Sequence, residues 1–169
     1  LGSIGDTAVA LPCLKFIRRR FPSARLSLLT NHPRRGEAPV LSVIGPMGLI
    51  DAVIPYAVGE RGPSELVRLA GRIRAERPDL VIYLSEYRGA LKLARDILFL
   101  RLAGARRILG APFAANLRAP KVIGPDGVLE REAARLARCL KSLGVVDLDD
   151  PGARDLDFNI VVVSDCCDD

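Results

Sequence analysis

The residues best suited to chemistry lie at the start of the chain. Gly2 and Gly5 enclose Ser3 and Ile4, Asp6 follows at once, and the next segment is apolar with helical spacing. Glycines let a backbone approach a ligand closely, and the N-terminus of a helix beyond them offers free N–H groups to an anion. Two hypotheses for Asp6 follow. In the first, its carboxylate caps the N-terminus of the helix. In the second, it is a general base at the mouth of a phosphate-binding cleft.

This glycine loop differs from the loops that bind dinucleotides or nucleoside triphosphates. The dinucleotide fingerprint needs three glycines and an acidic residue after the second strand, to hold the ribose. Here there are two glycines. The strand predicted at 25–29 is followed by Thr30 and Asn31, and neither of these residues is acidic. A Gly-Lys-Ser/Thr sequence is also absent. We therefore expect no nicotinamide cofactor and no nucleoside-triphosphate loop of that type.

Positive charge is concentrated in the first 144 residues. They carry a net charge of +12 and residues 145–169 one of −7, which together give the net +5 of the chain. A basic body suggests anionic partners such as phosphosugars, nucleic acid or an acidic membrane face. With 5% aromatic residues and no Trp, the chain is poor in platforms for stacked bases, and no nucleic-acid partner is expected.

Neither a metal site nor a membrane span is expected. The four cysteines form no C-x-x-C pair, and His32, most simply a loop residue, is the single histidine. Cys13 and Cys139 fall in helical patterns and are expected to be buried free thiols, whereas Cys166 and Cys167 lie in a polar tail. No apolar run approaches the ~18 residues that a spanning helix needs.

Helices and strands alternate along the chain. Helical spacing covers 10–21, with Pro12 inside it, and 64–77, whereas 25–29, 52–55, 80–84 and 107–110 are short apolar runs typical of strands. A helix over 88–103 is apolar around most of its circumference and is predicted to be largely buried. An amphipathic stripe covers 129–143, and 156–163 is a candidate for one more strand. This alternation predicts an α/β fold with a parallel sheet flanked by helices.

Several of these segments together resemble the N-terminal domain of the heptosyltransferase family, which has the two-domain GT-B fold. The resemblance rests on Gly2–Pro12, 14–30, Pro78–Ile82, Arg95–Gly104 and Ile108–Gly110. It implies a Rossmann-like acceptor domain over 1–144 and an acidic linker or inter-domain segment over 145–169. The first strand and the whole C-terminal domain of that fold would be missing from this stretch, which alone is then expected to be inactive.

The resemblance also implies an activity. Enzymes of this family transfer a heptose or a related sugar from a nucleotide diphosphate donor, here expected to be ADP-heptose, to the phosphorylated lipopolysaccharide core with inversion. Asp6 matches the aspartate that acts as general base, Gly2, Ser3 and Gly5 form its loop, and no metal is implied. The expected location is the cytoplasm, with possible peripheral contact with the anionic inner membrane.

Basic residues are candidates for holding the anionic acceptor. Arg88, Lys92 and Arg95 recur at i, i+4 and i+7 after the strand at 80–84, and Arg34 and Arg35 lie in another loop at the same edge. Ligands of open parallel sheets bind beyond the carboxyl ends of strands. The alternative is a solvated helix face on which Lys92 pairs with Asp96.

Two further functions remain open at this level. One is a non-enzymatic α/β module that binds polyanions, and the positive charge of residues 1–144 suits such a role. The other is a different nucleotide-sugar enzyme of the GT-B architecture, because folds of this kind host many chemistries.

Overall fold

A computed structural model describes residues 4–31, 44–56, 62–148 and 159–164 of the chain. Within them it contains four α-helices, two short 3₁₀ helices and seven strands. The helices are α1 (Ile4–Arg20), α3 (Pro63–Ala75), α4 (Ala90–Leu102), α5 (Glu132–Cys139), η1 (Gly45–Met47) and η2 (Ala115–Leu117). The strands are β1 (Arg25–Asn31), β2 (Ala52–Tyr56), β3 (Leu80–Leu84), β4 (Arg107–Leu109), β5 (Val122–Ile123), β6 (Val128–Leu129) and β7 (Asn159–Ser164).

Five strands form a central mixed sheet in the order β2-β1-β7-β3-β4. The pairs β1–β2 and β3–β4 are parallel, but β7 lies between β1 and β3 and runs antiparallel to both. The prediction of a wholly parallel sheet is therefore wrong for its central strand. Strands joined by helices are expected to be parallel, whereas the direction of β7 depends on long-range pairing that no local pattern specifies.

The central strand comes from the C-terminal segment of the chain. A further strand was predicted at 156–163, and β7 is observed at Asn159–Ser164 with the β-branched run Ile160-Val161-Val162-Val163. Such a run has high β propensity. Part of the segment that we expected to leave the domain thus belongs to its sheet.

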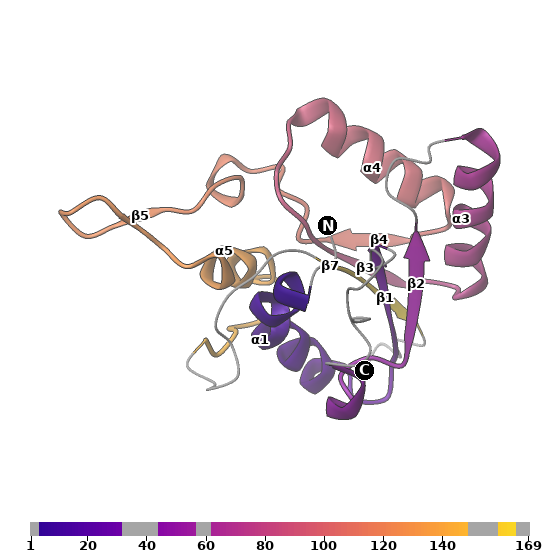
Figure 1. The fold of residues 1–169 in the computed structure, drawn as a ribbon, viewed down its shortest axis with the longest axis horizontal. Coiled ribbons are helices and arrows are strands. Elements are labelled where there is room, and N and C mark those ends of the chain that lie inside the picture. Colours follow the sequence, from indigo (N-terminus) through magenta and orange to yellow (C-terminus); the bar gives the residue numbers. More distant parts are fainter. Residues whose placement is uncertain (1–3, 32–43, 57–61, 149–158, 165–169) are drawn as a thin grey trace.

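Helices cover both faces of the central sheet (Figure 1). α1 and α5 pack on one face, where they share a hydrophobic core with β1 and β3, and α3 and α4 cover the other face with a second core. The architecture is mixed α/β in three layers.

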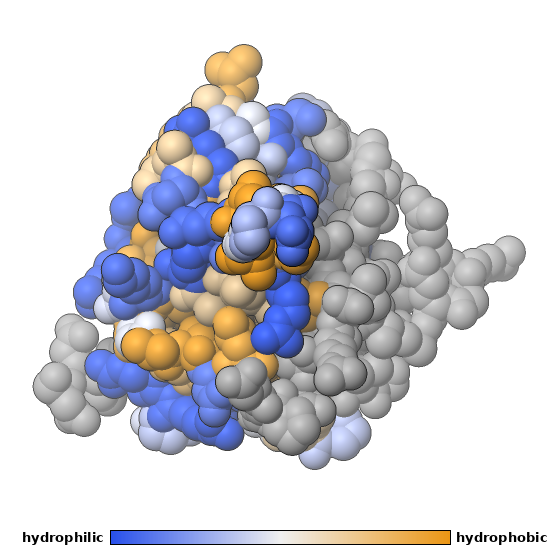
Figure 2. Space-filling model, turned by 90° about the vertical axis from the view of Figure 1, so that its left-hand side faces the viewer, coloured by the Kyte–Doolittle hydropathy of each residue, from blue (hydrophilic) through white to orange (hydrophobic). Residues whose placement is uncertain are grey.

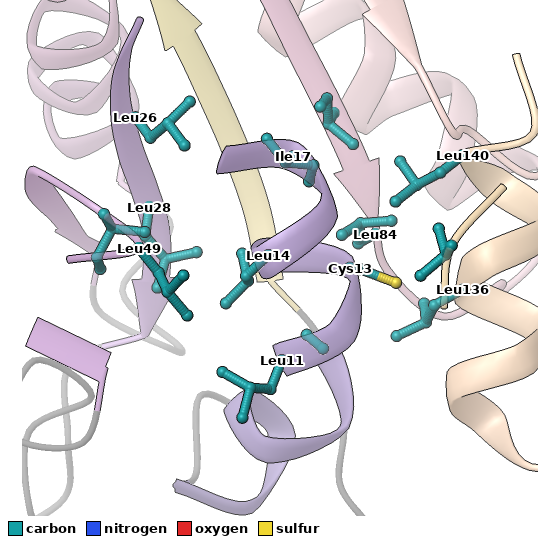
Figure 3. Close-up of a cluster of buried hydrophobic side chains, with 14 of the residues drawn as sticks. Leu11, Cys13, Leu14, Ile17, Leu26, Leu28, Leu49, Leu84, Leu136 and Leu140 are labelled. Atoms are coloured by element: carbon teal, nitrogen blue, oxygen red, sulfur yellow. The ribbon is translucent and has the colours of Figure 1, made fainter. Parts of the chain in front are cut away.

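Helix α1 shows how the first core is built. Its side chains at i, i+3 and i+6, Leu11, Leu14 and Ile17, are buried against Leu26 and Leu28 of β1. In Figure 3 Ile17 lies at the same level as Leu26, near the start of β1, and Leu11 lies further along β1, at the level of the strand's later residues. α1 therefore runs antiparallel to β1, and the N-terminus of the helix lies at the edge where β1 ends.

Most local predictions are confirmed. α1 continues through Pro12, β1 and β2 appear where expected, and β3 is buried along its whole length. α3 begins at Pro63 after Gly62, as a proline at the first helical position predicts. Cys13 and Cys139 are buried free thiols, and burial raises the pKa of Cys13 to about 12.

Two helix predictions need correction. α4 is not largely buried: only Leu93 and Leu100 are, whereas Leu91 is 88% exposed. Apolar residues around the whole circumference favour a buried helix, but they do not specify which parts of the protein cover each side of it. α5 covers eight residues rather than the whole stripe, because Leu129 belongs to β6 and the chain turns after Cys139.

Candidate functional site

The edge of the sheet where β1, β2, β3 and β4 end, here called the carboxyl edge, gathers three helix N-termini. Five residues separate the end of β3 from the start of α4, and α3 begins on the carboxyl side of β2. α1 reaches the same edge because it runs antiparallel to β1. Free N–H groups at helix N-termini and their positive dipole ends favour anions. The backbone alone thus makes this edge suited to a negatively charged ligand.

Asp6 lies within helix α1, as its third residue. The helix begins at Ile4, so Asp6 is in the first turn rather than at the N-cap position. This corrects the capping hypothesis, since a cap residue precedes the first helical residue. Gly5 is likewise helical, whereas Gly2, Ser3, His32, Arg34 and Arg35 fall outside the described residues. The catalytic hypothesis for Asp6 stays a prediction.

Arg88 lies in the segment between β3 and α4, not on the helix as expected. The helix begins at Ala90, and its N-cap Gly89 has φ 104° and provides no side-chain cap. Arg88 is exposed and has no hydrogen bond or ion pair among the described residues. Exposed Arg88 therefore precedes by two residues a helix whose first turn has no side-chain cap.

The electrostatic influence of Arg88 reaches two tyrosine hydroxyls at the same edge. Burial raises the pKa of Tyr83 to about 12, and the nearby Asp96 adds to this increase, while Arg88 opposes it. Burial also raises the pKa of Tyr56, and there again Arg88 acts in the opposite direction. Both phenols are therefore neutral near pH 7 and can donate a hydrogen bond.

Asp96 is engaged by two neighbours. The Tyr83 hydroxyl donates to Asp96 Oδ2 at 3.2 Å, and Arg95 Nε and Nη2 donate to Asp96 Oδ1 at 2.9 and 2.6 Å. The Lys92–Asp96 pair of the alternative hypothesis is not formed, and exposed Lys92 has no ion pair within the described part of the chain. Of the predicted basic set, Arg88 and Lys92 remain available to a ligand, and Arg95 is engaged.

Sequence reasoning missed the aromatic side chains of this edge. All three tyrosines of the chain, Tyr56, Tyr83 and Tyr87, lie at or just beyond strand ends and pack at the second core. The Arg118 guanidinium lies over the Tyr87 ring, 4.8 Å from its centroid. Their positions near the ends of predicted strands are the one signal in the sequence that could have found them.

A buried hydroxyl lies at the end of β1. Thr30 is 5% exposed, and its Oγ1 has no hydrogen-bond partner among the described residues. A buried hydroxyl without a partner costs free energy. It is therefore a polar group that a ligand or a water molecule at this edge could satisfy.

The segment that follows β4 is fastened to α5 by a buried arginine. Arg135 is 1% exposed, its Nε donates to both oxygens of Glu132 at 2.7 and 2.8 Å, and its Nη1 donates to the Leu117 carbonyl at 3.0 Å. This arginine has a structural role.

Metal and membrane features are absent from the part of the chain that the structure describes. No three His, Cys, Asp or Glu side chains gather there as a metal site would need. None of the helices there has the length and hydropathy to cross a bilayer.

Comparison with known proteins identifies no relative. No family model, no curated protein and no solved structure matches the chain.

Proposed function

We propose that the chain is the acceptor-binding domain of a glycosyltransferase that uses a nucleotide diphosphate sugar, of the heptosyltransferase type. The observation that carries the proposal is that the N-terminus of α1, with Asp6 in its first turn, and the N-terminus of α4, preceded by Arg88, lie at the same carboxyl edge of the sheet. The resemblance in the loop over 2–6 and in the segments that follow it adds to this support.

The geometry fits a phosphorylated acceptor. The first N–H groups of α4 have no side-chain cap, and exposed Arg88 precedes them by two residues. A phosphate placed there would accept hydrogen bonds from backbone amides and pair with the guanidinium.

In the proposed reaction, Asp6 accepts the proton of an acceptor hydroxyl. The hydroxyl oxygen forms a bond to the anomeric carbon of the donor sugar, and the bond from that carbon to the diphosphate oxygen breaks on the opposite face. The nucleoside diphosphate leaves with the electron pair, and the configuration is inverted. The first turn of α1 would stabilise the Asp6 carboxylate and so keep it ionised. ADP-heptose is the proposed donor and the lipopolysaccharide core the proposed acceptor, and a second domain would bind the donor.

Substitution of Asp6 in the full-length enzyme tests the proposal. Asp6→Asn keeps the volume of the side chain and removes its basicity, so turnover is expected to fall by roughly 10²–10⁴ with little change in KM. The melting temperature is expected to change little, because the interaction of a first-turn carboxylate with the helix dipole contributes only about 0.5 kcal/mol.

Asp79→Asn is the matched control. Asp79 precedes β3 at the opposite edge of the sheet and pairs with Arg106 at 3.5 Å, so its loss should leave turnover near that of the wild type. Normal turnover of Asp6→Asn would exclude the general-base role.

A further inference from the structure

The β5–β6 hairpin extends away from the body of the molecule (Figure 1). Val122 pairs with Leu129 and Ile123 with Val128, and the turn between the strands contains Gly124 and Gly127 with φ of 81° and 71°. Neither strand has a second neighbour within the described part of the chain. A hairpin without further strands or a covering helix is only marginally stable in water.

Both faces of this hairpin are apolar and exposed. Directly paired residues lie on the same face, and successive residues lie on opposite faces. Val122 and Leu129, 65% and 58% exposed, therefore form one face, and Ile123 and Val128, 52% and 56% exposed, form the other. An exposed apolar patch of this kind marks an interaction surface, and two apolar faces need cover from both sides.

The base of the hairpin is fixed to α5 by polar contacts. Glu130 accepts a hydrogen bond from the Lys121 N–H at 2.8 Å and also pairs with Arg138. Arg138 Nη2 donates to the Ala119 carbonyl at 3.1 Å. These contacts order the hairpin in its extended position, so the exposure of its apolar side chains belongs to the fold.

Charge is arranged along the hairpin from tip to base. Asp126 is exposed in the turn, and the exposed cations Lys121 and Arg131 lie at the other end, next to the strands. Glu130, the other acid of the hairpin, is engaged by Arg138. Figure 2, viewed from the side toward which the hairpin points, shows apolar and strongly hydrophilic atoms gathered side by side.

We propose that the hairpin is a dimerisation arm whose partner is the same hairpin of a second copy of this chain. When two hairpins lie antiparallel about a twofold axis, the acidic tip of each meets the basic base of the other. The face formed by Ile123 and Val128 of each hairpin then packs on the same face of the other hairpin. Such an interface is self-complementary, as twofold symmetry requires.

Charge favours this occupant over a lipid bilayer. Insertion of the hairpin into a membrane would carry the Asp126 carboxylate into the apolar region ahead of the apolar side chains, at a cost in free energy. A second copy instead offers that carboxylate cations. The surface of one hairpin is smaller than the ~800 Å² that each partner buries in a standard interface. We therefore expect a dimer that dissociates on dilution. The proposal is independent of the enzymatic role of Asp6.

Sedimentation equilibrium over a range of protein concentrations tests the proposal. The wild type is expected to rise toward twice the monomer mass, and Ile123→Ser/Val128→Ser to raise the dissociation constant at least tenfold. These side chains are more than half exposed, so the variant should keep the wild-type circular dichroism. Val67→Ser/Leu91→Ser is the matched control, because these residues of α3 and α4 are 72% and 88% exposed, and it should dimerise like the wild type.

A charge exchange separates this arrangement from other modes of association. Asp126→Lys or Lys121→Asp alone should weaken dimerisation about tenfold, because like charges then face each other across the interface. The double variant Asp126→Lys/Lys121→Asp should recover most of the loss. The proposal is overturned by a wild type that stays monomeric, by serine variants that dimerise normally, or by a double variant without recovery. Binding of wild-type monomers to vesicles of anionic phosphatidylglycerol through the same four side chains would instead assign the arm to a membrane.

Discussion

The two edges of the central sheet both carry arginines, but the arginines are engaged to different degrees. At the amino edge, where the parallel strands begin, Arg18 donates to the Ala24 carbonyl at 2.9 Å and to Asp51 at 2.7 Å. Arg25 pairs with Glu76 at 3.0 Å. At the carboxyl edge, Arg95 pairs with Asp96 at 2.6 Å, but Arg88 has no such partner among the described residues.

The difference has a physical cause in the direction of the helices. α1, α3 and α4 end at the amino edge, where free carbonyl groups and the negative dipole ends attract cations. Arg74, near the end of α3, donates to the Leu102 carbonyl at the end of α4, and Arg101 donates to the Ala105 carbonyl. The same three helices present N–H groups to the carboxyl edge. A basic residue there adds to a positive field instead of compensating a negative one.

A positive charge count therefore does not locate an anion site in this chain. The +12 of residues 1–144 includes arginines that cap helices and pair with acids. The candidates for binding an anion are the cations without a structural partner at an edge lined by helix N-termini.

Backbone contact at the carboxyl edge should give the largest effect on stability. Gly110 follows β4 with φ of 80°, and a Cβ there would lie 2.8 Å from the Tyr83 carbonyl oxygen. Gly110→Ala is therefore expected to lower the free energy of unfolding by about 3 kcal/mol, from backbone strain and overpacking together. Urea denaturation measures the change. Gly124→Ala is the control, because Gly124 has a similar φ of 81° but open space around it. It should cost only about 1 kcal/mol from backbone strain, and the difference between the two variants measures the steric clash at Gly110. Equal losses would contradict the close approach.

Loss of the Glu132 carboxylate should give the next largest effect. Glu132→Ala leaves the buried Arg135 guanidinium without its acidic partner, and we expect a loss of about 2 kcal/mol, moderated by the partial exposure of Glu132. The double variant Glu132→Leu/Arg135→Met removes both charges and should be more stable than Glu132→Ala alone. If the double variant is the less stable one in thermal unfolding, the guanidinium does not depend on that carboxylate.

At the amino edge, Asp51→Ala should cost about 1 kcal/mol. Burial opposes ionisation, but hydrogen bonds from the Leu26 N–H and from Arg18 outweigh it and lower the pKa of the Asp51 carboxyl. A lowered folded-state pKa means that the contribution is present above the unfolded pKa of about 4 and is lost as the pH falls through the folded value. The difference in stability between wild type and Asp51→Ala should therefore shrink below pH 4. A difference that is constant from pH 7 to pH 3 would contradict the ionic role of Asp51.

Arg88→Gln should have the smallest effect on stability, under about 0.5 kcal/mol, since exposed substitutions without structural partners are nearly neutral. It should nevertheless weaken the binding of inorganic pyrophosphate about tenfold in calorimetric titration, since a charge-assisted pair is lost. Arg106→Gln is the matched control at the amino edge, because Arg106 is also exposed and makes only a 3.5 Å pair with Asp79. Equal loss of affinity in both variants would remove the distinction between the edges.

Local signals were sufficient for most elements of the fold. The Gly62-Pro63 start of α3, the continuous apolar run of β3 and the glycine after β4 each specify their own structure through dihedral preference or burial. The same signals misjudged α5, since a stripe at helical spacing continued through Leu129, which pairs in a hairpin instead. The spacing of apolar residues shows which face a helix would bury if it formed, but it does not by itself make the segment helical.

The sequence by itself determined the alternation of helices and strands, the buried thiols Cys13 and Cys139, and the basic character of the body. Only the tertiary structure decided that β7 lies between β1 and β3, that α4 stays half-covered, and that Tyr56, Tyr83 and Arg88 share one edge. The physical reason is the distance along the chain over which each interaction acts. Dihedral preference, helix periodicity and strand burial act between residues close in the chain, whereas strand order and the pairing of charges are set by contacts between distant segments.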